Sequence, residues 1–207
     1  MQTAQASYAH RLYQQFKALD QPDEYSEEYC AELSGLVGEI LELKREQNAV
    51  VLAHNYQRPE IFEVADFVGD SLELAKRGRD FTQTTLVLCG VHFMAETAKI
   101  LSPEKRVLIP DSRAGCSLAE SVDADDLVAR RDELRTVYPD LKVVSYVNTS
   151  AAVKAVTDVC CTSSNAAGIV EGVDSDNILF VPDENLAAYV ARSTKKNIIA
   201  WNGNCYV

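Results

Sequence analysis

The chain has 207 residues, enough for a buried core and for one large or two small domains, and it carries a formal net charge of −11 with a pI near 4.7. The negative charge argues against nucleic acid or an anionic membrane surface as a partner, because both would repel the protein on average. The sequence shows neither a signal-peptide core nor an apolar run near the ~18 residues of a membrane span, so we expect a cytoplasmic protein.

Two amphipathic helices are predicted near the N-terminus, over residues 8–19 and 26–47. Pro22 separates them, and Ser26 is placed to cap the second helix ahead of an acidic first turn. We interpret residues 1–48 as helices that brace the core and carry no chemistry. The second helix shows an apolar stripe made of Tyr29, Leu33, Leu36, Val37, Ile40, Leu41 and Leu43.

Short apolar runs then alternate with helical segments in a first α/β unit, which we assign to residues 49–125. A helix is expected near Ser117, at the end of this unit. Because the apolar runs do not strictly alternate with polar residues, they favour parallel strands buried on both faces. The predicted strands are AVVLAHNYQ, TLVLCGVHF and RVLIPDS, and the predicted helices between them are DSLELAKRG and MAETAKIL.

The pattern recurs in a second unit, assigned to residues 126–207, after a charged stretch that we interpret as a connector, DADDLVARRDELRTVYPD. Its predicted strands are KVVSYVNTS, VCCTSSN, ILFVPDEN and IIAWNGNCYV, with helices AAVKAV, AAGIVEGV and LAAYVARS between them. The internal repeat predicts an α/β protein with repeated three-layer α/β/α units, short parallel sheets and preceding N-terminal helices.

Polar residues follow several of the predicted strands. Because ligands of open parallel sheets bind beyond the carboxyl ends of the strands, these residues are expected to share one edge of each sheet. Helix N-termini at that edge attract carboxylate or phosphate, so an anionic small molecule is a plausible substrate. The residues are His54, Asn55 and Tyr56 in the first unit and Tyr146, Asn148, Thr162, Ser163 and Ser164 in the second.

Each of these residues also has a structural interpretation. His54 suits a backbone-satisfying role, and Ser71 and Ser163 suit helix capping. Tyr56 and Tyr146 are either packing rings or proton donors. The residues His92, Glu96 and Lys99 lie at helical spacing, which is equally typical of surface ion pairs.

The six cysteines divide by context. Cys30 and Cys89 stand in apolar patterns and are predicted to be core residues, whereas strand alternation sends the adjacent Cys160 and Cys161 to opposite faces. The sequence contains no close C-x-x-C pair of the kind that forms a zinc ribbon, and disulfides are not expected in an intracellular chain. The remaining two, Cys116 and Cys205, lie in glycine-containing loops after strands, and we predict that they are soft-metal ligands. The alternative is that they are ordinary structural cysteines, although such loops offer them no core to fill.

Some familiar motifs are absent or incomplete. The string Gly69-Asp70-Ser71-Leu72 matches a hydrolase motif, but no histidine follows His92 to serve as its base. Neither a G-x-G-x-x-G dinucleotide fingerprint nor a phosphate loop occurs. A hydrolase acting through Ser71 and an ordinary nucleotide-binding protein are therefore disfavoured.

Eight segments together carry a specific resemblance, in unchanged order from about residue 49 onward. The chain resembles the quinolinate synthase family of NAD biosynthesis. The segments are AHNYQ (53–57), GDSLELA (69–75), FMAETAKIL (93–101), PDSRAGCSLA (110–119), YVNTSAAVKA (146–155), CTSSNA (161–166), PDENLA (182–187) and WNGNCYV (201–207).

The resemblance implies an enzyme that condenses iminoaspartate with dihydroxyacetone phosphate to give quinolinate, phosphate and water, with L-aspartate oxidase as the upstream supplier. It implies three pseudo-symmetric domains that each give one cysteine to a [4Fe–4S] cluster acting as a Lewis acid. Cys116 and Cys205 would be two of the ligands, and Tyr56 and His54 would be catalytic. The substrate contacts implied are His54, Ser71, Tyr146, Val147, Asn148 and Ser163.

The family pattern continues past the position of Val207 with a third domain that supplies the third cysteine. We therefore expect the 207-residue chain alone to be inactive. The alternative is a non-catalytic two-domain remnant that binds a dicarboxylate or phosphate.

Overall fold

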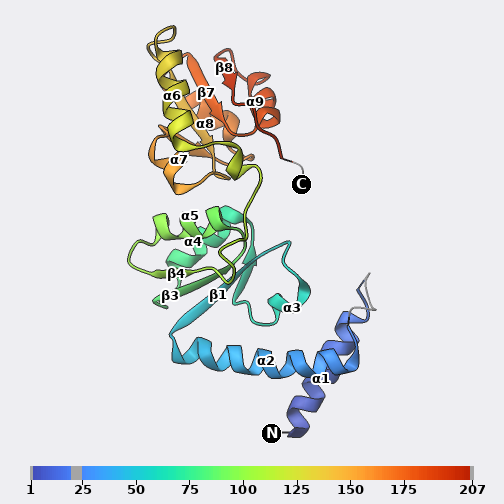
Figure 1. The fold of residues 1–207 in the computed structure, drawn as a ribbon. Helices are drawn as coiled ribbons and strands as arrows, with labels where there is room; N and C mark the ends of the chain where they lie inside the picture. Colours follow the sequence, from blue (N-terminus) through green and yellow to red (C-terminus); the bar gives the residue numbers. More distant parts are fainter. Residues whose placement is uncertain (1, 20–24, 206–207) are drawn as a thin grey trace. The chain divides into compact units, whose positions relative to one another are not determined.

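The computed structural model describes residues 2–19 and 25–205, with side chains described from Gln5 onward. The chain divides into two compact units, the first made of residues 1–90 and 102–110 and the second of residues 91–101 and 111–207. Each unit contains one parallel sheet (Figure 1).

The first unit begins with a pair of packed helices, α1 (Gln2–Phe16) and α2 (Glu27–Glu46). The Ser26 hydroxyl accepts a hydrogen bond from the Tyr29 amide at 3.1 Å, which confirms the predicted cap. Phe16 and Tyr25 stack with ring centroids 4.6 Å apart in the core between the helices. Pro22 and Asp23, predicted to separate the helices, lie outside the described residues.

The predicted apolar stripe of α2 is only partly buried. Leu33 and Val37 are buried, but Leu36 and Leu43 are 53% and 54% exposed, and Ile40 is exposed as well. A long stripe on a helix indicates only that one side is apolar, and of these stripe residues Tyr29, Leu33 and Val37 pack into the core clusters.

The sheet of the first unit has the order β2-β1-β3-β4, with all neighbours parallel. Its strands are β1 (Ala49–His54), β2 (Phe67–Gly69), β3 (Thr85–Cys89) and β4 (Arg106–Leu108), and the helices α3 (Pro59–Phe62) and α4 (Ser71–Asp80) connect the first three. The short edge strand β2 was not predicted, because its three residues are too few to show a period.

Both faces of β1 are buried. Val51 and Ala53 pack with Val37 of α2 on one face. Val50 and Leu52 pack with Leu74 of α4 on the other. This alternation of buried contacts is the expected signature of a parallel strand covered by helices on both sides.

The second unit begins with α5 (His92–Leu101) and continues after β4 through a 3-10 helix at Ala119–Ser121. The helix predicted near Ser117 is only this single turn. The stretch interpreted as a connector instead forms α6 (Ala124–Arg135), capped by the Asp123 carboxylate on the Asp125 amide. The many charged residues of α6 gave no helical period in the sequence, although Leu127 and Leu134 are buried.

The sheet of the second unit has the order β6-β5-β7-β8, again parallel throughout. All seven predicted elements are found: β5 (Lys142–Tyr146), α7 (Ala151–Ala155), β6 (Val159–Cys161), α8 (Ala166–Gly172), β7 (Asn177–Val181), α9 (Glu184–Ala191) and β8 (Asn197–Ala200).

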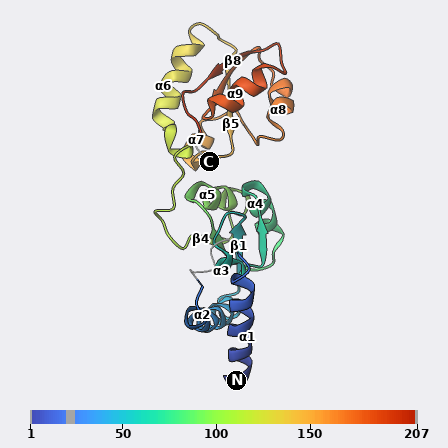
Figure 2. The same ribbon diagram turned by 90° about the vertical axis from the view of Figure 1, so that its right-hand side faces the viewer.

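Helices cover both faces of this second sheet, with α6 on one side and α8 on the other in Figure 2. Val143 and Leu179 pack against Leu127 of α6. Val144 and Phe180 pack against α8 and α9. The α/β fold with repeated three-layer units and preceding helices is therefore confirmed.

The same two supporting contacts occur in both sheets. The Asp66 carboxylate accepts a hydrogen bond from the Val51 amide at 2.7 Å, and the Asp158 carboxylate accepts one from the Val143 amide at 2.8 Å. Each aspartate precedes the edge strand and ties it to the central strand. Each also pairs with a lysine, Lys44 at 2.8 Å or Lys142 at 3.2 Å.

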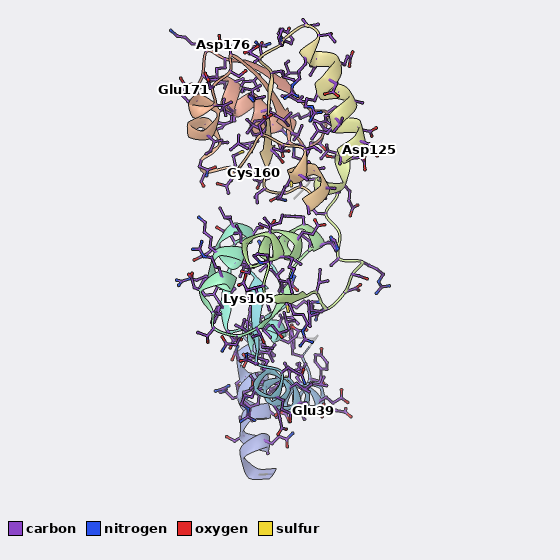
Figure 3. All side chains as sticks on the ribbon, turned by 90° about the vertical axis from the view of Figure 1, so that its left-hand side faces the viewer. Glu39, Lys105, Asp125, Cys160, Glu171 and Asp176 are labelled. Carbon is purple, nitrogen blue, oxygen red and sulfur yellow. The ribbon has the colours of Figure 1, made fainter. Side chains whose placement is uncertain are left out.

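A lysine amine caps the end of one helix in each unit. Lys105, which is buried and labelled in Figure 3, donates to the carbonyls of Gly78 at 2.7 Å, Arg79 at 3.2 Å and Phe81. Lys196 donates to the carbonyls that end α8, Val170 at 2.9 Å, Glu171 at 3.1 Å and Val173. The last carbonyls of a helix lack the amide partners that a further turn would supply, and a cation suits the negative end of the helix dipole.

In the part of the chain that the structure describes, no helix has the length and apolar character needed to cross a membrane.

Candidate functional site

His54 ends β1 and is buried, with Tyr56 folded over it. The two ring centroids are 3.7 Å apart, and the His54 Nδ1 accepts a hydrogen bond from the Tyr56 backbone amide at 3.4 Å. An Nδ1 that accepts places the proton of the neutral imidazole on Nε2. His54 is thus set up to offer an Nε2–H donor.

Burial lowers the pKa of His54, and the negative charge of Asp70 opposes that shift. Desolvation disfavours the imidazolium, so the neutral ring predominates at pH 7. A neutral imidazole can donate to a carboxylate or accept a proton during a reaction. The geometry is compatible with either role.

Ser71 follows at the first position of α4, next to the C-terminal end of β2. The N-cap of this helix is Asp70, whose carboxylate accepts from the Glu73 amide at 2.8 Å. The capping interpretation of Ser71 is therefore wrong. Its hydroxyl stands instead at the positive end of a helix dipole.

Tyr146 ends β5 in the second unit, at the position that His54 occupies in the first. Burial raises the pKa of Tyr146, a hydrogen bond with Ser163 opposes the shift, and the negative charges of Cys205 and Asp183 add to it. The phenol is therefore neutral at pH 7 and keeps its proton for donation.

Ser163 is available to Tyr146 because it does not cap α8. Asn165 is the residue that precedes α8, and its side chain accepts from the Thr162 amide at 2.7 Å. The Thr162 and Ser164 hydroxyls pair with each other at 2.9 Å. The capping interpretation of Ser163 is thus wrong, and its hydroxyl faces the phenol.

The loop after β5 carries the predicted contacts Val147 and Asn148. Val147 is buried and its amide donates to the Cys161 carbonyl at 2.8 Å. The Thr149 hydroxyl donates to the Tyr146 carbonyl at 3.0 Å. Ser150 caps α7 through the Val153 amide at 3.2 Å.

The residues His92 and Glu96 take part in more than a surface pair. His92 Nδ1 lies 3.8 Å from a Glu96 oxygen, and the other Glu96 oxygen accepts from the Ala151 amide at 2.9 Å. Glu96 therefore holds the start of α7, directly after the loop that carries Asn148.

The burial of Cys30 and Cys89 agrees with their prediction as core residues. All six are free thiols, and Cys30, Cys89 and Cys161 are buried, whereas Cys160 is exposed. The adjacent pair thus points to opposite sides of its strand, as expected. Burial raises the pKa of Cys161 to about 12, which makes its thiol a poor ligand at neutral pH. Cys116 is half-buried and Cys205 is exposed, and their role as metal ligands stays a prediction.

Cys116 lies in a loop folded on its own glutamate. Its amide donates to a Glu120 carboxylate oxygen at 3.3 Å, and the Glu120 amide donates to the Cys116 carbonyl at 2.9 Å. A cavity of about 390 Å³ opens beside Cys116 and is lined also by His92, Glu96 and Ser150.

The loop that carries Cys205 is fixed to the loop that follows Cys116. The Trp201 indole donates to the Ser121 carbonyl at 3.0 Å, and the Gly203 carbonyl accepts from the Glu184 amide at 2.7 Å. A Cβ at Gly203 would lie 2.5 Å from the Ser121 hydroxyl and 2.6 Å from the Pro182 carbonyl oxygen. Only glycine allows this close approach.

No group of three or more metal-ligand side chains gathers anywhere in the described ranges. Cys116 and Cys205 are accessible thiols on fixed loops, which suits iron–sulfur ligation. A cluster held by three cysteines would draw its third from elsewhere than these two loops.

The structure brings together several of the predicted residues within each unit. His54 and Tyr56 are in contact in the first unit, and Asp70 and Ser71 lie at the start of α4, directly after the neighbouring strand β2. Tyr146, Ser163 and Cys205 interact in the second. Sequence reasoning missed two residues here, Asp183 and Lys154. The importance of both residues depends on neighbours that are distant in the sequence. The PDEN string could nevertheless have indicated that Asp183 caps a helix, as it does.

The family profile described as "Quinolinate synthetase A protein" (NadA) matches residues 38–207. A quinolinate synthase of Xylella fastidiosa (strain 9a5c) is 58% identical over 169 residues, 81% of this chain and 49% of that protein. A quinolinate synthase of Agrobacterium fabrum is 58% identical over 81% of this chain and 48% of its own length.

A longer match extends to the N-terminal helices. The protein named quinolinate synthase 2 of Mesorhizobium japonicum is 52% identical over 208 residues, which cover 100% of this chain and 61% of that protein. The chain spans about half the length of most of the curated relatives it matches.

Proposed function

The chain belongs to the quinolinate synthetase A protein family, and from that premise we propose that it supplies two α/β units of an enzyme that condenses iminoaspartate with dihydroxyacetone phosphate to quinolinate. L-aspartate oxidase would supply the iminoaspartate, and the reaction would run in the cytoplasm.

One observation carries the proposal furthest. Tyr146 forms a hydrogen bond with Ser163, and the Cys205 side chain lies close enough to interact with the phenol electrostatically. Two predicted substrate contacts and one predicted cluster ligand therefore lie together at the carboxyl edge of the second sheet. That edge is where an open parallel sheet binds its ligand.

The residues of the first unit suit an anionic substrate. The His54 Nε2–H and the Ser71 hydroxyl at the start of α4 are hydrogen-bond donors at one sheet edge. Such fixed, uncharged donors can bind a carboxylate without a cationic side chain. Tyr56, stacked on His54, is assigned the role of acid/base helper.

The residues of the second unit suit orientation of the closing ring. The neutral Tyr146 phenol can donate a proton, and its hydrogen-bond partner Ser163 lies on the loop after β6. Val147 and Asn148 directly follow Tyr146 on the loop after β5. Fixing two reactants in one geometry removes much of the entropic part of a bimolecular barrier.

Cys116 and Cys205 are the thiols of this chain that we assign to a [4Fe–4S] cluster, together with a third cysteine from outside this chain. When bound, such a cluster supplies an open iron that acts as a Lewis acid in the loss of water. The buried thiols Cys30, Cys89 and Cys161 are not candidates.

A chimera tests the function. Residues 1–207 replace the aligned part of the Mesorhizobium japonicum relative, which spans this whole chain. After anaerobic reconstitution with iron and sulfide, we expect quinolinate to form from dihydroxyacetone phosphate and enzymatically generated iminoaspartate. Cys205→Ser and Cys116→Ser should lower bound iron and abolish the product, whereas Cys160→Ser, another accessible cysteine, should leave both unchanged.

A folded chimera that retains iron and sulfide but makes no quinolinate would overturn the proposed reaction. Retention of a binding site alone, shown by saturable dicarboxylate or phosphate binding to the 207-residue chain, would instead support the remnant.

A further inference from the structure

Lys154, on α7, holds the loop that presents the second-unit substrate contacts. Its amine donates to the Val147 carbonyl at 2.9 Å and to the Thr149 carbonyl, and it lies 3.4 Å from the Thr149 hydroxyl. These acceptors flank Asn148 on both sides. The lysine therefore clamps the backbone around a residue that is predicted to touch substrate.

The clamp is continuous with Tyr146. Thr149 donates its hydroxyl to the Tyr146 carbonyl at 3.0 Å and also pairs with the buried Ser145 hydroxyl at 3.0 Å. A displacement of Thr149 would thus be transmitted to the backbone of the tyrosine. The ammonium group cannot turn to an alternative acceptor cheaply, because it is desolvated within this loop and its pKa is lowered by burial.

The corresponding loop of the first unit is held differently. There the His54 imidazole itself accepts the Tyr56 amide, so a substrate contact also fixes its own loop. In the second unit Tyr146 has no such bond to its loop amides among the contacts that the structure describes. Lys154 holds that loop instead, through the carbonyls of Val147 and Thr149.

We propose that Lys154 is a positioning residue of the substrate site, which sets the places of Tyr146 and Asn148 by clamping the carbonyls of Val147 and Thr149. The inference rests on the proposed function for its kinetic meaning. The lysine itself does not touch substrate, so its loss should act on binding and orientation, not on a proton transfer.

The test compares Lys154→Met, Lys154→Arg and a control, Lys142→Met. Lys142 is the first residue of β5, the strand that ends at Tyr146, and it pairs at the surface with Asp158. In the chimera we expect Lys154→Met to raise KM for iminoaspartate about tenfold or more with a smaller change in kcat, because a misplaced contact weakens binding before chemistry. Lys154→Arg should recover part of the loss, and Lys142→Met should match the parent.

A second readout does not depend on quinolinate formation. Hydrogen exchange of the 207-residue chain should show faster exchange of the Val147 and Thr149 amides in Lys154→Met but not in Lys142→Met. If the parent chimera makes no quinolinate, the proposed function fails, and this exchange contrast alone then decides whether Lys154 clamps the loop. A folded Lys154→Met protein with parental KM, or with parental exchange at both amides, overturns the inference.

Discussion

The two parallel sheets share a scaffold and differ in the residues that end their strands. Both have the same strand order, and both tie the edge strand to the centre through an aspartate, Asp66 or Asp158. Both close a helix end with a lysine, Lys105 or Lys196. The repeated residues are those that satisfy buried backbone groups, which any copy of the fold must do.

The strand-end residues have diverged. His54 of the first sheet stands opposite Gly69, and Tyr146 of the second stands opposite Cys161 at the equivalent register. Burial keeps both His54 and Tyr146 neutral, by lowering the pKa of the one and raising that of the other. Two different side chains thus meet one requirement, an uncharged hydrogen-bond donor at a desolvated edge.

The largest effect is expected from the helix-end lysines. Lys105→Met removes the amine from three carbonyls in a buried place and should lower the free energy of unfolding by ~2–4 kcal/mol, since unpaired buried carbonyls are costly. Lys196→Met breaks the same contacts in a partly exposed place, where water can substitute, and should cost about half as much. Urea unfolding monitored by circular dichroism measures both.

Lys195→Met is the matched control, because this neighbouring lysine is exposed. It should leave the unfolding free energy within ~0.5 kcal/mol of the parent. Equal losses for Lys105→Met and Lys196→Met would show that burial does not distinguish the two caps.

The cysteine loops offer the next contrast. A Cβ at Gly203 would meet the Pro182 backbone oxygen at 2.6 Å, so Gly203→Ala should cost ~1–3 kcal/mol of stability through strain. A Cβ at Gly115 would meet only the Glu120 carboxylate, the end of an exposed side chain that can move, so Gly115→Ala should cost within ~0.5 kcal/mol. Thermal unfolding of the two variants compares them, and a larger loss for Gly115→Ala would reverse the expected order.

Much of the fold was predictable because the apolar runs of the second unit are long and its turns are polar. The repeat could also have located β2, since Asp66-Phe67 and Asp158-Val159 begin the edge strands at matching places. Helix α6 escaped because a helix with few buried residues looks like a charged connector. The helix is stabilised by the burial of a few residues against the sheet, which the local composition does not reveal.

The site was predictable only in part. Strand ends of parallel sheets gather at one edge, so His54, Tyr146 and Ser163 could be selected from their positions alone. Lys154 could not, because its partners are backbone carbonyls and these leave no signal in the sequence. The roles assigned to all these residues stay predictions.

The aspartate ties should give a smaller and more even effect. Asp66→Ala and Asp158→Ala each remove one acceptor from a strand amide, at Val51 or Val143, and should each cost ~1–2 kcal/mol. Asp→Asn at either position keeps an acceptor oxygen and should cost less than Asp→Ala. Chemical unfolding checks all four variants, and a loss confined to one sheet would show that the ties are not equivalent.

The smallest expected effect concerns the charge beside His54. Its folded-state pKa is lowered by burial, so the neutral ring stabilises the fold above the unfolded value of about 6.5, and this contribution is lost as pH falls through the folded-state pKa. The stability of the parent relative to His54→Gln should therefore shrink as pH decreases from 7 to 5. An unchanged difference would mean that the imidazole is as well solvated as in the unfolded chain.

Asp70→Asn sharpens this test because it removes the charge that opposes the shift while asparagine still caps α4. We expect the His54 midpoint, followed by the imidazole carbon–proton signals in NMR, to fall further. Asp80→Asn, at the other end of α4, should leave the midpoint where it is. A midpoint that rises in Asp70→Asn would mean that the aspartate acts on His54 through the local structure and not through its charge, and the parallel drawn between His54 and Tyr146 would then rest on burial alone.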